Sequence, residues 1–211
     1  MTLRTACYDS QAMASVLVFD MGGVLYDFQG DRLIAETSRR ARRWRSEEVQ
    51  ERWVPLVRAF ETGKSSEAEF AEAVVQSYDL TLSPAEFPER FRAAAFGFYE
   101  GALTLMHELR ARHRLLSLSN TNPLQWPKVL EDLGEADPFH GHFPSYVSGF
   151  HKPDPRAFAA VARTLADGSE CHFFDDRALN VAAAKAAGWQ ARRVRGVAEA
   201  RRACVELGLL G

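Results

Sequence analysis

The sequence predicts an α/β fold, a doubly wound parallel sheet with an inserted all-helical cap. In the C-terminal half, short apolar runs alternate with longer helical segments, a pattern typical of a parallel sheet covered on both faces. Between residues 31 and 98 strand signals are missing, and apolar residues recur at helical spacing. Polar clusters directly follow the apolar runs, where ligands bind in sheets of this kind.

The first strand is predicted at Val16–Phe19, an apolar run that stops at Asp20 and the Gly22-Gly23 pair. We interpret residues 1–15 as an N-terminal extension, because they lack the apolar stretch that a signal peptide needs. Met13 offers an alternative start, so residues 1–12 need not belong to the native chain.

Residues 28–100 are predicted to form the helical cap, which is rich in alanine, glutamate and arginine. Breaks at residues 61–66 and at Ser83-Pro84 divide it into several helices, for which Ser66 and Ser83 are suitable N-caps. The start of the first break, residues 61–64, is either a loop facing the site or a plain helix connection. Large aromatic side chains are expected to form the cap core: Trp44, Trp53 and Phe60.

Residues 16–27 and 101–211 are predicted to form a Rossmann-like core. Its further strands are expected at residues 115–118, 146–148, 172–174 and 191–194. Its helices are expected at residues 102–112, 124–133, 155–165 and 178–187, with a last helix closing the chain.

The composition describes an ordinary globular protein. With 211 residues and a net charge of −2, the chain can bury a core and gives no electrostatic case for nucleic acid or an anionic membrane as partner. No stretch approaches the ~20 apolar residues that cross a bilayer, and the arginine-rich run at 39–45 is interpreted as a solvated helix face. The three cysteines form no CxxC pair, so we expect neither disulfides nor zinc, and a cytoplasmic location: Cys7, Cys171 and Cys204.

Four polar clusters are predicted to meet at one edge of the sheet: Asp20-Met21-Gly22-Gly23, Ser119-Asn120-Thr121, His151-Lys152-Pro153 and Asp175-Asp176. Each has an ordinary explanation, such as a helix cap at Ser119 or a solvated lysine at a helix start. Together they are more specific, because two carboxylates about 4 Å apart repel by roughly 4 kcal/mol at an effective dielectric constant of about 20. A Mg²⁺ ion removes that penalty, and Lys152 and Ser119 then suit the oxygens of a phosphoryl group.

The motifs at 19–25 (Phe-Asp-Met-Gly-Gly-Val-Leu), 119–121 (Ser-Asn-Thr), 151–154 (His-Lys-Pro-Asp) and 173–176 (Phe-Phe-Asp-Asp) resemble the four ordered motifs of the haloacid dehalogenase superfamily. The resemblance covers the chain from Val16 onward, and the inserted segment resembles the cap of subfamily IA. Within the superfamily, the sequence is similar to glucose-1-phosphatase-like enzymes and to the phosphatase domain of epoxide hydrolases.

The resemblance implies a magnesium-dependent phosphatase that acts on a small-molecule phosphate ester, with sugar phosphates among the candidates. Asp20 would be the nucleophile that forms an aspartyl phosphate. Asp20, the carbonyl of Gly22 and Asp176 would hold Mg²⁺, with Asp175 assisting. The phosphate would be bound by Ser119, Asn120 and Lys152.

Gly22 departs from the family pattern, which usually has a second aspartate there as general acid and base. Loss of such a group typically lowers the rate by about 10²- to 10⁴-fold, and Tyr26, Asp27 or His151 are candidates to replace it. We therefore expect substrates with stable leaving groups. Two alternatives stay open: a metal-independent 2-haloacid dehalogenase, against which Asp175-Asp176 argues, and a weakly active protein that binds a phospho-ligand.

Overall fold

The computed structural model describes residues 15–39 and 46–211. The expectations for residues 1–14, for the arginines at 40–45, and for Cys7 and Trp44 lie outside the described residues. In the described part of the chain, no helix is both long and apolar enough to cross a membrane.

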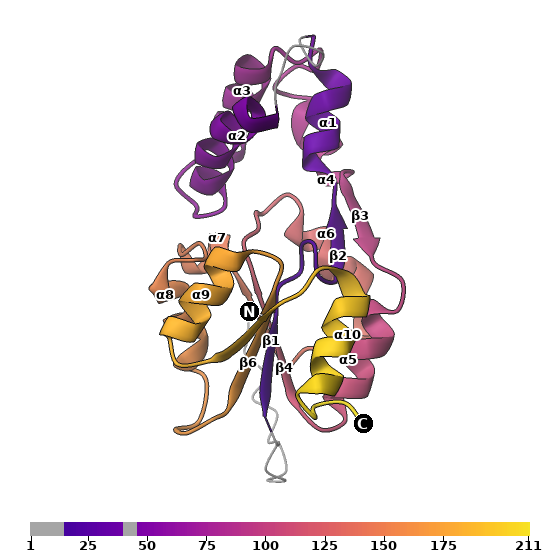
Figure 1. Cartoon of the computed structure of the whole chain (residues 1–211). Helices are drawn as coiled ribbons and strands as arrows, with labels where there is room; N and C mark the ends of the chain where they lie inside the picture. Colours follow the sequence, from indigo (N-terminus) through magenta and orange to yellow (C-terminus); the bar gives the residue numbers. More distant parts are fainter. Residues whose placement is uncertain (1–14, 40–45) are drawn as a thin grey trace.

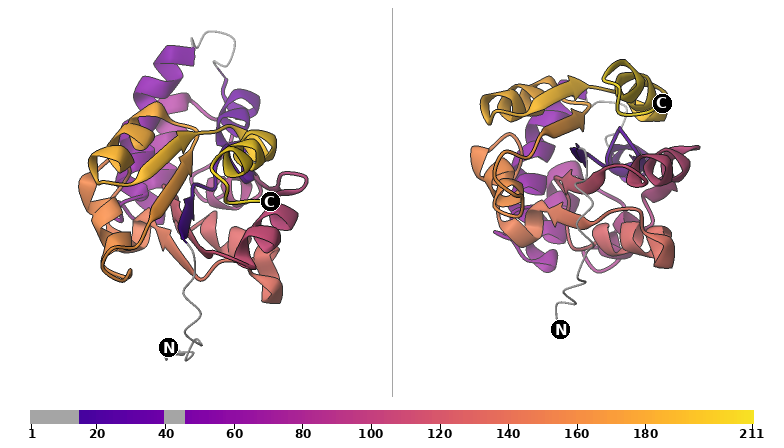
Figure 2. Two further views of the ribbon diagram at one scale, coloured as in Figure 1. Left: turned by 60° about the horizontal axis from the view of Figure 1, so that its bottom comes forward. Right: turned by 90° about the horizontal axis from the view of Figure 1, so that it is seen from below.

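The core is a five-stranded sheet in which every neighbouring pair of strands is parallel, with the order β5-β4-β1-β6-β7. Figure 1 shows this sheet below the cap, with β1 near its middle, and Figure 2 shows the same arrangement in two turned views. The strands are β1 Val16–Phe19, β4 Arg114–Ser119, β5 Gly141–Pro144, β6 Cys171–Asp175 and β7 Gln190–Arg193. The predicted parallel α/β fold is therefore confirmed.

Helices cover both faces of the sheet, because alternate residues of β1 point to opposite faces. Leu17 and Phe19 pack against α5 (Ala102–Arg110), α6 (Trp126–Leu133) and α10 (Gly196–Glu206). Val16 and Val18 pack against α8 (Pro155–Ala162) and α9 (Ala178–Ala186). The two helical layers lie on opposite sides of the sheet in Figure 1.

The weak strand predicted at residues 146–148 is wrong, because that segment is part of the short helix α7, Ser145–Ser148. The strand lies just before it, at β5, where Gly141–Pro144 pairs only with β4. An edge strand is buried less than a central one, so it needs no continuous apolar run. The side chain of Val147, which suggested a strand, is 70% exposed.

The cap contains α1 (Gly30–Thr37), α2 (Ser46–Phe60), α3 (Glu67–Tyr78) and α4 (Phe87–Arg92). Its core is aromatic, as expected from Trp53 and Phe60: the Phe60 ring stacks on Phe70 at 4.4 Å between centroids, and Trp53 meets Phe70 edge-on at 5.9 Å. Ser66 caps α3 in a reciprocal pair with Glu69, which confirms that prediction.

The prediction that no strand lies between residues 31 and 98 is wrong at its end. Ala95–Phe98 forms β3, which pairs antiparallel with β2, Tyr26–Phe28. This ribbon contains the two chain crossings between core and cap, seen side by side in Figure 1. Strands this short carry too few residues to show an alternating pattern, so only the meeting of distant segments reveals them.

Candidate active site

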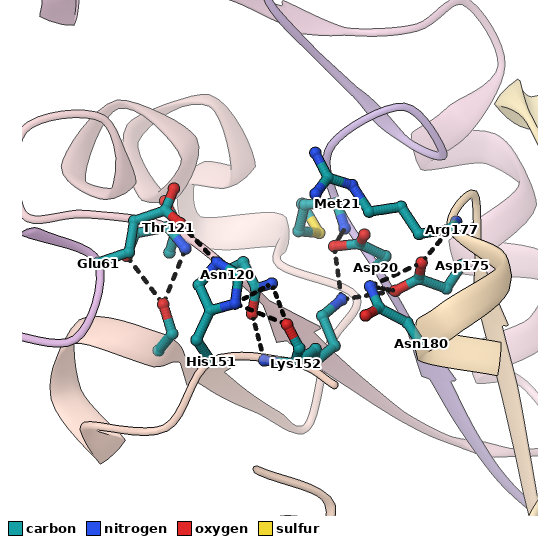
Figure 3. Close-up of polar contacts among 11 residues, drawn as sticks. Asp20, Met21, Glu61, Asn120, Thr121, His151, Lys152, Asp175, Arg177 and Asn180 are labelled. Atoms are coloured by element: carbon teal, nitrogen blue, oxygen red, sulfur yellow. Dashed lines mark hydrogen bonds and ion pairs between the residues drawn. The ribbon is translucent and has the colours of Figure 1, made fainter. Parts of the chain in front are cut away.

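The structure brings most of the predicted site residues to the carboxyl edge of the sheet (Figure 3). Asp20 follows β1, Asp175 ends β6, and Asp176 comes next in the chain. Lys152 reaches the same place from the loop before α8. Ser119 is buried at the end of β4 and does not cap α6, which begins at Trp126.

Lys152 lies between two carboxylates and is only 1% exposed, so it is not a solvated lysine. Its Nζ is 3.0 Å from Asp20 Oδ1 and donates to Asp175 Oδ2 at 2.7 Å. The backbone N–H of Met21 also donates to Asp20 Oδ1, at 2.7 Å. The ammonium group therefore holds both carboxylates in place.

Asp175 is fully buried, and its two oxygens are held on several sides. Asn180 Nδ2 lies 3.0 Å from each oxygen, and the N–H of Arg177 donates to Oδ1 at 2.8 Å. Asn180 was not among the site residues predicted from the sequence. Its signal was a polar residue in the first turn of the helix that follows the Asp175-Asp176 pair.

The electrostatics of the site follow from burial. Burial raises the pKa of Asp20 to about 8; Lys152 opposes this shift, while Asp175 and Asp176 add to it. Burial alone would also raise the pKa of Asp175, but Lys152 and the hydrogen bonds bring it below its usual value. The pKa of Asp176 is raised by burial and by Asp175. One ammonium group thus does not neutralise three neighbouring carboxylates.

The donor set fits a hard divalent cation. Carboxylate oxygens of Asp20, Asp175 and Asp176 lie within 4.8 Å of one another, and carboxylates are ligands that Mg²⁺ prefers. With Lys152, the three ionised carboxylates would leave a net charge of −2, which a divalent cation balances. Gly23 has φ +73°, and a Cβ there would lie 3.1 Å from Asp176 Oδ2. Only glycine therefore suits this turn beside the Asp176 carboxylate.

Asn120 pairs with the backbone of Lys152. Its Oδ1 accepts from Lys152 N–H at 2.8 Å, and its Nδ2 donates to Lys152 O at 3.0 Å. The side chain is thus engaged in positioning Lys152, which sequence reasoning did not foresee. Thr121, the last residue of the Ser-Asn-Thr motif, lines the cavity with a buried hydroxyl that has no hydrogen-bond partner among the described residues.

The candidates for the acid missing at Gly22 differ in position. Tyr26 is buried and donates to Asp132 at 2.6 Å, and Asp27 accepts from Gln29 at 2.7 Å. Neither lines the cavity, whereas His151 does, with its Nε2 3.0 Å from Glu61 Oε2. Glu61 begins the segment at 61–64, for which the sequence left open a loop facing the site or a plain helix connection; of these four residues, Glu61 lines the cavity.

A cavity of about 370 Å³ opens above these groups, between core and cap. The volume lies in the range of small-molecule sites. Asp20, Asp176, Asn120 and Arg177 line its core side, and residues of α1, α2 and α4 line its cap side. The site can therefore hold a small anion at its floor and an organic group below the cap.

A family model described as haloacid dehalogenase-like hydrolase matches residues 14–188. The chain is 31% identical over 188 residues to Phosphatase MT3486 of Mycobacterium tuberculosis (strain CDC 1551 / Oshkosh), covering 84% of this chain and 85% of that protein.

Two solved structures share the fold at lower identity. One is the HAD family enzyme bt-2542 from Bacteroides thetaiotaomicron in complex with magnesium and inorganic phosphate, with a TM-score of 0.68, 21% identity, and 86% and 94% coverage of the two chains. The other is L-2-haloacid dehalogenase from Xanthobacter autotrophicus, with a TM-score of 0.62, 22% identity, and 86% and 78% coverage. Given the family match and the relative, the chain belongs to the haloacid dehalogenase-like hydrolases.

Proposed function

We propose that this hydrolase is a magnesium-dependent phosphatase that cleaves small phosphate monoesters through an aspartyl phosphate on Asp20. The observation that carries the proposal is the arrangement at the cavity floor. A buried Lys152 touches the carboxylates of Asp20 and Asp175, and Asp176 stands beside them. The phosphatase relative supports the choice of phosphate as the group transferred.

In this reaction a carboxylate oxygen of Asp20 attacks phosphorus, and the bond to the leaving oxygen breaks with its electron pair. Water then attacks the same phosphorus, the bond to Asp20 breaks, and phosphate leaves. Lys152 opposes the effect of burial on the pKa of Asp20 and orients its carboxylate, and Ser119 and nearby N–H groups bind the phosphoryl oxygens. Bound Mg²⁺, held by Asp20, Asp176 and the Gly22 carbonyl, would neutralise charge on the phosphoryl group.

The test is hydrolysis of an aryl phosphate with Mg²⁺, by wild type and Asp20→Asn. We expect Asp20→Asn to lose turnover, because an amide is not a nucleophile. Its melting temperature should equal or exceed that of wild type in chelator, because the amide buries no charge. Turnover near the wild-type rate would exclude Asp20 as the nucleophile.

The metal assignment has a separate test. Both oxygens of Asp175 are engaged with Lys152 and Asn180, whereas Asp176 lines the cavity. We therefore expect Asp176→Ala to need a higher Mg²⁺ concentration for half-maximal activity than Asp175→Ala. An equal or reversed order would overturn the assignment.

The similarity to a haloacid dehalogenase keeps a second reaction in view, in which Asp20 attacks carbon. Release of halide from 2-chloropropionate in the presence of chelator would favour it. The three clustered carboxylates support the metal-dependent reaction instead. A protein that only binds a phospho-ligand would bind phosphate without turnover on any ester.

A further inference from the structure

The cap side of the cavity is apolar, in contrast to its polar floor. Among the described cap residues that line it, only Glu61 has a charged side chain, and the indole N–H of Trp53 is the one other side-chain hydrogen-bond donor. The Glu61 carboxylate is already 3.0 Å from His151 Nε2. The apolar members come from β2, α1, α2 and α4, and we call them the apolar roof: Phe28, Ile34, Trp53, Val54, Val57 and Phe91.

The aromatic part of this roof is held rigidly. The Trp53 ring contacts Phe91 and Phe70 edge-on, each at 5.9 Å between centroids. Gly30 lets these rings approach α1, because a Cβ there would lie 3.2 Å from the Phe91 ring and 3.8 Å from Trp53. A preformed aromatic wall can bind a flat ring without the entropic cost of ordering its own side chains.

Val54 extends the roof although it is 43% exposed. A valine that lines the cavity and stays accessible gains by contact with an apolar ligand. A sugar in this position would place most of its hydroxyl groups against aliphatic and phenyl side chains that cannot form hydrogen bonds with them, which disfavours binding. The roof therefore opposes the sugar phosphates that the sequence resemblance suggested.

Gly22 restricts the substrate independently of the roof. Because no carboxylic acid stands at that position to protonate the leaving oxygen, a leaving group that is stable as an anion is favoured. Phenolates and aromatic carboxylates are both stable as anions and flat. Such leaving groups depart without an acid at position 22, and their flat apolar rings can pack against the apolar roof.

We propose that the substrate is an aryl phosphate or aromatic acyl phosphate whose ring lies against the apolar roof; the proposal rests on the phosphatase function proposed above. Asp20 attacks phosphorus, and the aromatic phenolate or carboxylate departs with the electron pair of the broken P–O bond. The ring remains against the apolar roof until the product leaves.

The kinetic test compares benzoyl phosphate with acetyl phosphate in the presence of Mg²⁺. Both release a carboxylate of similar basicity, so the chemical step is matched and the ring is the difference. We expect kcat/KM to be at least about tenfold higher for benzoyl phosphate. Hydrolysis of both at equal kcat/KM would overturn the proposal and leave the phosphatase function standing.

A binding test does not depend on turnover. Phenylphosphonate and methylphosphonate share a head group that the protein cannot hydrolyse, and calorimetry with Mg²⁺ measures both Kd values. We expect phenylphosphonate to bind at least about tenfold more tightly. This preference without hydrolysis of any ester would mean that the phosphatase function fails while the aromatic site stands, and equal affinities would overturn the site itself.

Two matched variants locate the ring. Val54→Ser replaces an accessible roof residue, and Val205→Ser replaces a valine that is 55% exposed on α10, outside the cavity. Val54→Ser should reduce the ratio of the two phosphonate affinities severalfold, and Val205→Ser should retain the wild-type ratio. An unchanged ratio in Val54→Ser, with wild-type melting behaviour, would exclude this wall as the ring site.

Discussion

Lys152 is a buried cation whose two partners are also buried. Burial alone would lower the pKa of its ammonium group, but Asp175 and Asp20 raise it above the usual value. A buried ion pair of this kind adds little net stability, because the desolvation of its charges offsets their attraction. Removing it, however, leaves two carboxylates without compensation.

We predict that Lys152→Met lowers the free energy of unfolding by about 3–5 kcal/mol in chelator, the usual loss when one partner of a buried pair is removed. Lys185→Met, at an exposed position in the last turn of α9, is the control and should stay within about 0.5 kcal/mol of wild type. Urea titration of both variants measures this. A loss below about 1 kcal/mol for Lys152→Met would contradict the electrostatic account.

Gly22 and Gly23 differ although they are neighbours. Gly23 has a positive φ, which other residues rarely adopt, but Gly22 does not, and a Cβ on Gly22 would meet only the Phe28 ring, at 3.3 Å. The backbone therefore does not require glycine at position 22, contrary to the usual reason for a glycine in a turn.

Gly22→Asp should accordingly fold and supply the missing acid. We predict that it raises the rate on alkyl phosphates by about tenfold or more, because a positioned acid helps most when the leaving oxygen is most basic. Gly22→Ala has the same Cβ without the carboxyl group and is the control. Rates for phosphate esters of graded leaving-group pKa should fall steeply in wild type and Gly22→Ala and flatten in Gly22→Asp. A flat series in wild type would mean that another residue, with His151 the candidate at the cavity, acts as the acid.

At the scale of single elements, α3 shows how local chemistry starts a helix. Ser66 Oγ accepts from the Glu69 N–H at 3.2 Å, and Glu69 Oε2 accepts from the Ser66 N–H at 2.7 Å. The adjacent Ser65 has a buried hydroxyl without a hydrogen-bond partner in the described part of the chain. Ser66 therefore stabilises the start of the helix, whereas the unpaired hydroxyl of Ser65 destabilises it.

We predict that Ser66→Ala lowers the free energy of unfolding by about 1 kcal/mol, the typical loss of an N-cap. Ser65→Ala should be neutral or stabilising, because it removes a polar group that burial leaves unpaired. Denaturant unfolding of the two variants makes the comparison. Equal losses would show that Glu69 alone sustains the start of the helix.

At the scale of the whole molecule, His172 links stability to pH. It is buried in β6, and burial holds its pKa below the usual value, with Glu170 opposing and His113 and Arg192 adding to the shift. Its Nε2 lies 3.3 Å from Glu170 Oε1 without forming a directed hydrogen bond. The native protein therefore favours the neutral ring.

The sign of the effect follows from proton uptake. An unfolded histidine titrates near pH 6.5, so below that pH the unfolded chain binds a proton that the native state refuses. The stability is present above about pH 6.5 and is lost as pH falls through the lower native pKa, by at most about 1.4 kcal/mol per pH unit. We predict that His172→Leu flattens the decline between pH 7 and 5, while His107→Leu, at an exposed position, does not. Urea titrations across that range decide it, and parallel slopes would contradict the assignment.

The sequence alone determined the central strands and the place of the candidate catalytic groups. Strands buried on both faces are mostly apolar, so β1, β4 and β6 stand out as short apolar runs, of which Val16–Phe19 is the clearest. Because the strands are parallel, the polar residues after each run meet at one edge. Asp20, Lys152 and Asp175-Asp176 were therefore predictable from local pattern and topology.

The tertiary structure decided what depends on contacts between distant segments. The edge strand β5, the β2–β3 ribbon and the pairing of Asn120 with the Lys152 backbone leave no periodic signal in the chain. The apolar roof likewise exists only because the cap docks over the core, and the same side chains would otherwise be interpreted as the core of a helical domain. Periodicity records which face of an element is buried, but the partner that buries it is set by packing across the whole fold.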